Sequence, residues 1–127
     1  MTEPLLGRFD AVFADLDGVV YAGPHAIPGA PEALQGLEGA GVKLAYITNN
    51  ASRSSAAVAE HLRDLGAPAT AENVFGSAQA GAELLAGLVP AGSRVLVTGS
   101  ATLRDQVRAQ GLEPVDSAEE NPAAVIQ

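Results

Sequence analysis

The sequence predicts an α/β fold in which helices cover both faces of a parallel sheet. Short apolar runs of strand length alternate with segments whose apolar residues recur at helical spacing. Glycine and proline separate these segments, at points where turns are expected. The chain has 127 residues, of which 47% are hydrophobic, so it can form a packed core of ordinary domain size.

The first half of the chain begins with a strand and a helix. Residues 11–14 form a short apolar run that ends at Asp15, as expected for a buried strand. A helix is expected between Pro31, near its start, and Gly41, at its end. Residues 43–47 form a second apolar run, which predicts the next strand.

Two further helices are expected after the second strand. Ser52 and Ser54 are candidate N-caps for a helix that Gly66 ends. The spacing of alanine and leucine predicts another helix over residues 78–88. Strands and helices therefore alternate, which is the pattern of a crossover-connected parallel sheet.

The pattern restarts after a joint at residues 90–93. Residues 94–97 predict a strand, residues 102–109 predict a helix that Gly111 ends, and residues 123–126 predict another strand. In parallel sheets, ligands bind beyond the carboxyl ends of the strands. We therefore expect the loops that follow the first two strands to share one pocket.

The first of these loops contains an acidic pair. Asp15 and Asp17 are two residues apart, so an extended backbone projects both carboxylates to one side. Such close like charges require a cation or a shared proton, and Mg²⁺ favours hard oxygen ligands. Asp15 could attack phosphorus while Asp17 moves protons, and Gly18 permits a tight turn that lets backbone amides approach a phosphate. The alternative is that both acids merely cap a turn.

The second loop carries a hydroxyl and two amides. Thr48, Asn49 and Asn50 could cradle phosphate oxygens near the start of the next helix, whose positive end attracts anions. The same residue types also form turns and helix caps, which is the alternative. Of the remaining polar residues, Tyr21 is expected to pack within its loop and His61 to lie on the surface of its helix.

The two loops together resemble the haloacid dehalogenase superfamily. The matching segments are Asp-Leu-Asp-Gly-Val-Val-Tyr at 15–21, Ile-Thr-Asn-Asn-Ala-Ser-Arg-Ser at 47–54, Leu-Arg-Asp-Leu-Gly at 62–66, and Ser-Ala-Gln at 77–79. Within the superfamily, the chain looks like the branch of nitrophenyl-phosphatase, glycerol-phosphate, phosphoglycolate and pyridoxal-phosphate phosphatases. The resemblance implies a Rossmann-like three-layer parallel core, with residues 1–90 as its first part and residues 91–127 as the truncated start of an α/β cap domain.

The resemblance also implies a role for each site residue. Asp15 would be the nucleophile and a Mg²⁺ ligand, and Asp17 the general acid and base, with its carbonyl on the metal. Thr48 and Asn49 would hold the transferring phosphate, with Asn50 beside them. The expected reaction is hydrolysis of a small phosphate monoester through an aspartyl-phosphate, with glycerol 3-phosphate as the first candidate and 2-phosphoglycolate as the second.

Two parts of the family's machinery are missing from the sequence. The family uses a later lysine and a later Gly-Asp loop, whereas the only lysine here, Lys43, starts its strand, far from Asp15. We therefore expect an N-terminal fragment. The alternative function is an inactive fragment that binds phosphate, Mg²⁺ or a partner.

Composition limits the partners. The net charge of −8 argues against binding to nucleic acid. No apolar run reaches the ~18 residues of a membrane span, and residues 1–8 lack the pattern of a secretory signal. With no cysteine, the chain fits a cytoplasmic location. Homodimerisation through the cap of the full-length protein is one option that the resemblance implies.

Overall fold

The computed structural model describes residues 5–127, which divide into two compact units. Unit 1 comprises residues 5–48 and Ser55–Phe75, and unit 2 comprises Asn49–Ser54 and Gly76–Gln127. The prediction that residues 1–8 lack a secretory signal falls partly outside the described residues, which begin at residue 5. No helix within residues 5–127 is both long enough and apolar enough to cross a membrane.

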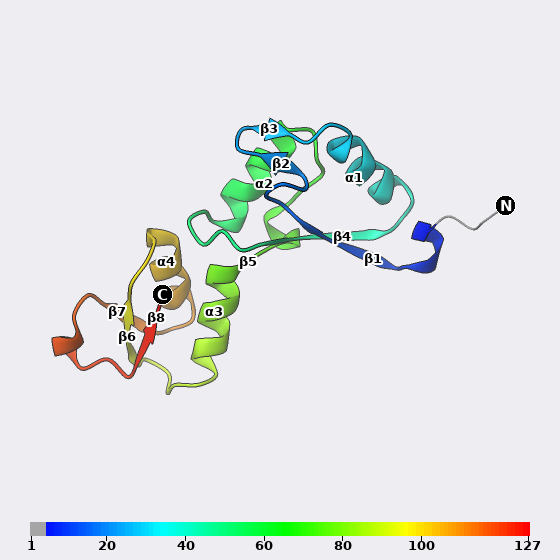
Figure 1. The fold of residues 1–127 in the computed structure, drawn as a ribbon. Coiled ribbons are helices and arrows are strands. Elements are labelled where there is room, and N and C mark those ends of the chain that lie inside the picture. The colour runs from blue at the N-terminus through cyan, green and yellow to red at the C-terminus, as the bar shows by residue number, and fades with distance from the viewer. Residues whose placement is uncertain (1–4) are drawn as a thin grey trace. The chain divides into compact units, whose positions relative to one another are not determined.

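Unit 1 is built on a sheet with the strand order β1-β4-β5 (Figure 1). Strand β1 (Ala11–Asp15) and strand β4 (Lys43–Thr48) pair in parallel, as the two apolar runs predicted. Helix α1 (Ala30–Gly39) has a proline in its first turn, and helix α2 (Ser55–Asp64) follows β4. Both helices were predicted. Strand β5 (Val74–Gly76) was not, because three residues are too few to show a period.

The core of unit 1 lies between this sheet and the two helices. Strands β1 and β4 contribute Ala14 and Tyr46, and the helices contribute a stripe each. The buried helix residues are Leu34 and Leu37 of α1 and Val58, Ala59 and Leu62 of α2. Since all of them belong to one cluster, α1 and α2 cover the same face of the sheet.

The opposite face of this sheet is apolar but exposed within the described residues. Phe13 is 69% exposed, Ile47 50% and Phe75 47%. Successive side chains of a strand point to opposite faces, so Phe13 and Ile47 face away from Ala14 and Tyr46. The two helices of unit 1 thus cover one face of this sheet.

Between β1 and α1 the chain forms a small hairpin that the sequence did not reveal. Strand β2 (Tyr21–Ala22) and strand β3 (His25–Ala26) are antiparallel and two residues long each. The turn between them contains Gly23 at φ 57°. Two short 3-10 turns, η1 (Leu5–Arg8) and η2 (Ala71–Asn73), complete unit 1.

Unit 2 has a parallel sheet of its own, with the order β7-β6-β8. Its elements are α3 (Ser77–Ala86), β6 (Arg94–Val97), α4 (Ala101–Ala109), β7 (Glu113–Val115), the 3-10 turn η3 (Ala118–Glu120) and β8 (Ala124–Ile126). Val95 and Val97 pack against buried residues of both helices. The predicted helices and strands are confirmed, and β7 was missed.

The mixed α/β class with parallel sheets is confirmed. Helix α3 belongs to unit 2 by packing, although it precedes the predicted domain boundary at residue 90. The two units are defined by contacts within residues 5–127 alone. The division into a core part, 1–90, and the start of a cap domain, 91–127, therefore stays a prediction.

Candidate active site

The pairing of β1 with β4 determines where the two predicted loops begin. Asp15 is the register partner of Ile47, and Thr48 follows as the last residue of β4. Because the strands are parallel, Asp15 and Thr48 lie at the same carboxyl edge of the sheet. The structure therefore confirms that the first two strands end together. Lys43 pairs with Ala11 at the opposite edge, as the sequence predicted.

The two acids alternate with a core residue. Asp15 and Asp17 are exposed, whereas Leu16 between them is fully buried. The backbone N–H of Leu16 donates to Oδ1 of Asp15 over 2.8 Å, which orients this carboxylate. Leu16 therefore anchors the loop in the core while both carboxylates remain open to solvent.

A tight turn follows the acids. Gly18 has φ 79°, a left-handed conformation that glycine adopts without strain. The carbonyl of Leu16 accepts from the N–H groups of Val19 and Val20 at 3.1 and 2.9 Å. The N–H of Gly18 itself donates to the carbonyl of Tyr21 over 2.8 Å. Gly18 thus shapes the turn, and in this conformation its amide is engaged within the chain rather than directed at a ligand.

Thr48 ends β4 with its side chain almost fully enclosed. It is 4% exposed and is the one buried polar side chain in the part of the chain that the structure describes. It alternates with Ile47 and so shares the core face with Tyr46. Packing therefore fixes the side chain of Thr48 at the edge where Asp15 also lies.

The loop at residues 49–54 packs within unit 2. Oδ1 of Asn50 accepts from the N–H and the hydroxyl of Ser52 at 2.9 and 2.5 Å, which is the turn that the alternative reading expected of this residue. The carbonyl of Asn49 accepts from the hydroxyl of Ser77 over 3.1 Å, and that of Ala51 accepts from the hydroxyl of Ser100 over 2.7 Å. The loop is therefore held by the starts of two helices.

The donor set fits Mg²⁺ better than a softer metal. Asp15 and Asp17 are two residues apart in sequence and offer hard carboxylate oxygens, and Mg²⁺ commonly takes one or two carboxylates with water and phosphate oxygens. Within residues 5–127, no three His, Asp or Glu side chains converge as a metal cluster would require. Asp15 and Asp17 could therefore provide part of a magnesium site.

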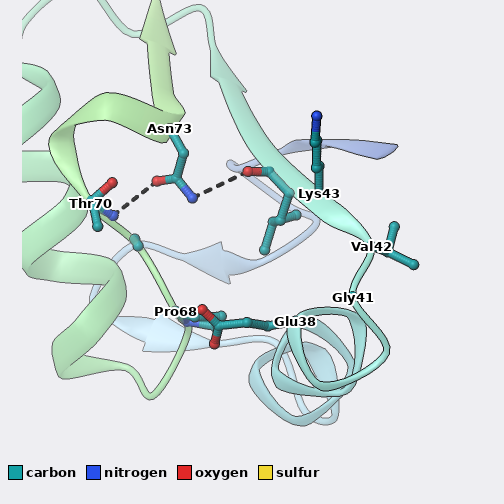
Figure 2. A pocket seen from close by; sticks show the side chains of 9 residues that line it. Glu38, Gly41, Val42, Lys43, Pro68, Thr70 and Asn73 are labelled. Atoms are coloured by element: carbon teal, nitrogen blue, oxygen red, sulfur yellow. Dashed lines mark hydrogen bonds between the residues drawn. The ribbon is translucent and has the colours of Figure 1, made fainter. Parts of the chain in front are cut away.

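A separate cavity of about 350 Å³ lies at the start of β4, away from the acids (Figure 2). Glu38, Lys43 and Asn73 are among the residues that line it, and the side chain of Lys43 points away from Glu38. Asn73 is used internally: Oδ1 accepts from the N–H of Thr70 at 2.9 Å, and Nδ2 donates to the carbonyl of Leu44 at 3.2 Å. The hydrogen bonds of Asn73 therefore connect Thr70 with strand β4, which is a structural role.

The chain is similar to known hydrolases over most of its length. The pattern described as haloacid dehalogenase-like hydrolase matches residues 12–113, and the chain belongs to this family. It is 44% identical, over 118 residues, to the D-glycerol 3-phosphate phosphatase of Mycobacterium tuberculosis, covering 93% of this chain and 33% of that protein. The human glycerol-3-phosphate phosphatase is 41% identical, over 89% of this chain and 37% of its own length.

A solved structure gives the same result. The crystal structure of the Mycobacterium tuberculosis glycerol phosphate phosphatase in complex with magnesium has a TM-score of 0.89 and 42% identity. It matches 99% of this chain and 38% of that one. The chain thus spans between a third and two fifths of the length of these relatives.

One contact near the site was missed from the sequence. His61 was expected on the surface of α2, and it is partly exposed, but it also meets the β2–β3 hairpin, 38 residues earlier in the chain. No local pattern in the sequence signals a contact over this separation. The predicted packing of Tyr21 is confirmed, since Tyr21 is 5% exposed.

Proposed function

We propose that this chain carries the nucleophile-bearing part of a Mg²⁺-dependent phosphatase that acts on a small phosphate monoester. Glycerol 3-phosphate is the first candidate substrate, supported by two relatives named for it, and 2-phosphoglycolate is the second. The observation that carries the proposal is the parallel pairing of β1 with β4, which brings Asp15 and Thr48 to one edge of the sheet.

The proposed reaction has two steps. A carboxylate oxygen of Asp15 attacks phosphorus, the bond to the ester oxygen breaks, and the departing alkoxide takes a proton from Asp17. Asp17 then removes a proton from water, which attacks the aspartyl-phosphate and releases inorganic phosphate and free Asp15. Each residue returns to its starting state.

The remaining residues bind and neutralise. When bound through Asp15 and Asp17, Mg²⁺ would supply positive charge against the phosphate oxygens. Thr48 and Asn49 are proposed to hold the transferring phosphate, in line with the importance of positioning in phosphoryl transfer. Asn50 keeps the loop in shape through Ser52, and Gly18 keeps the acidic turn.

The proposal extends to the setting of the protein. The net charge of −8 supports a protein that does not bind nucleic acid, and the lack of cysteine fits a reducing cytoplasm. Dimerisation through the cap of the full-length protein stays a prediction.

A second candidate function is a fragment that binds phosphate or Mg²⁺ without turnover. Two observations are consistent with it: Lys43 lies at the opposite edge of the sheet, and no third acid joins Asp15 and Asp17 among residues 5–127. In this reading the chain keeps the cradle and lacks part of the catalytic charge.

A phosphatase assay separates the two functions. Glycerol 3-phosphate and 4-nitrophenyl phosphate are offered with Mg²⁺ to the 127-residue chain and to any longer natural form. Turnover that disappears in Asp15→Asn supports the enzyme. Binding of Mg²⁺ or inorganic phosphate without turnover in either form supports the second function instead.

A further inference from the structure

The β2–β3 hairpin lies beside helix α2 (Figure 1). His61 of α2 contacts the hairpin at Gly23 and Tyr21. Nε2 of His61 lies 3.3 Å from the carbonyl oxygen of Gly23, in the turn of the hairpin. The rings of His61 and Tyr21 meet edge to face, with centroids 4.9 Å apart and planes at 73°. Because a carbonyl only accepts, the hydrogen bond requires the proton of the imidazole on Nε2.

Tyr21 connects this contact to the acidic turn. A single β-bridge joins Tyr21 to Asp17, and the carbonyl of Tyr21 accepts from the N–H of Gly18 over 2.8 Å. Tyr21 therefore stands between His61 on one side and the Asp17–Gly18 turn on the other. A side chain on α2 can act on the backbone of Asp17 through this one residue.

The hairpin needs such support. Its strands are two residues long each, and hairpins this small are marginal on their own in water. Apart from its own pairing, the hydrogen bond from the N–H of Ile27 to the carbonyl of Val20, at 2.9 Å, closes its base. The two contacts of His61 hold the hairpin at its turn, through Gly23, and at the start of β2, through Tyr21. The next residue of the helix, Leu62, is fully buried.

We propose that His61 is a positioning residue for Asp17. It holds the hairpin through Gly23 and Tyr21, and the hairpin fixes the turn that presents the Asp17 carboxyl group. This inference rests on the proposed function, in which Asp17 exchanges a proton with the leaving oxygen and with water. A general acid acts only within hydrogen-bond reach, so a small displacement of the turn lowers the rate of the chemical step.

The first test measures the turn directly. Amide hydrogen exchange is followed by NMR on the 127-residue chain and on His61→Ala. The reporters are the N–H groups of Gly18 and Ile27, and that of Lys43, which donates to the carbonyl of Asp10 at the far edge of the sheet. We expect Gly18 and Ile27 to exchange about fivefold faster in the variant, with Lys43 unchanged.

Two further variants separate positioning from general loss of stability. His61→Gln keeps a side-chain donor near Gly23 and should restore much of the protection of Gly18. Glu60→Ala changes the exposed neighbour of His61 and should leave all three rates as they are. Equal acceleration of all three amides in His61→Ala, or of none, would overturn the proposal.

The second test uses whichever form turns over 4-nitrophenyl phosphate. His61→Ala should lower kcat about tenfold with little change in KM, and His61→Gln should recover part of the loss. An unchanged kcat in His61→Ala would overturn the proposal. If no form turns over, the proposed function fails, and the exchange rates alone decide whether His61 holds the Asp17 turn.

Discussion

Each of the two units has a parallel strand that ends in a loop with polar residues, but the polar side chains differ in what they contact. In each, a parallel strand ends in a loop that leads into another element: β1 runs into the acidic turn, and β6 runs into Thr98-Gly99-Ser100 before α4. In unit 1 the polar side chains at and just after the end of β1, those of Asp15 and Asp17, are exposed. In unit 2, the polar residue Ser100 makes hydrogen bonds within the protein.

Ser100 shows how a polar loop residue is used structurally. Its Oγ accepts from the N–H of Leu103 at 3.2 Å, which caps α4, and its hydroxyl donates to the carbonyl of Ala51. A Cβ on Gly99 would come within 3.1 Å of Leu103, so close packing favours glycine there. The comparison teaches that the end of a parallel strand is a candidate ligand site when its polar side chains are exposed, as those of Asp15 and Asp17 are, and not when they cap a helix, as Ser100 does.

The most decisive way to break this comparison is Asp15→Asn. Without a nucleophilic carboxylate, turnover should fall at least about 10³-fold, because the covalent step is lost. Steady-state rates with 4-nitrophenyl phosphate and Mg²⁺ measure this, and circular dichroism should show an unchanged fold since Asp15 is exposed. A variant that retains full rates would remove the distinction between the two units.

A core substitution tests whether the units are separate in stability. Leu62 is fully buried in unit 1, so Leu62→Ala should lower the free energy of unfolding by about 2–5 kcal/mol. The matched change in unit 2 is Val107→Ala, also at a fully buried position. Exchange of amides assigned to each unit should report destabilisation in the unit that carries the change. Equal acceleration in both units for both variants would indicate one cooperative core.

The buried tyrosine of unit 1 predicts loss of stability at high pH. Burial, with the negative charge of Glu38 adding to it, raises the pKa of Tyr46 from 10.0 to about 12. The folded state therefore favours the neutral phenol, whose hydroxyl donates to the carbonyl of Pro68 over 2.6 Å. This contribution is complete below pH 10 and is lost as the pH rises through 12.

Tyr46→Phe isolates this effect. It should be about 1 kcal/mol less stable than the wild type at neutral pH, where the hydrogen bond to Pro68 is lost. Between pH 10 and 12 its free energy of unfolding should fall less steeply than that of the wild type. Denaturant titrations over this range provide the measurement, and parallel curves for the two proteins would contradict the assignment.

The smallest expected effect sharpens the role of Ser100. Ser100→Ala removes the cap of α4 and should lower the stability of unit 2 by about 1 kcal/mol. Ser100→Thr keeps a hydroxyl that can accept from the N–H of Leu103 and donate to the carbonyl of Ala51, and it should retain most of that stability. Thermal unfolding of the three proteins tests the pair, and equal melting temperatures would show that the cap is energetically neutral.

Most of the helices and the longer strands could be predicted because they depend on local sequence patterns. The apolar runs of β1 and β4 and the Pro31-to-Gly41 helix follow from side-chain periodicity and backbone preference. The short strands did not show, because pairing with distant segments, rather than propensity, forms them. Strand β7 contains Pro114, which argues locally against a strand.

The candidate site divides in the same way. The sequence by itself determined which groups could perform the chemistry, since Asp15, Asp17, Thr48 and Asn49 follow apolar runs in a recognisable pattern. Only the tertiary structure decided that β1 and β4 pair in parallel, that the N–H of Gly18 donates to the carbonyl of Tyr21, and that His61 contacts the hairpin. The physical reason is that residue type and spacing are local, whereas register, burial and contacts between distant segments exist only once the chain has packed.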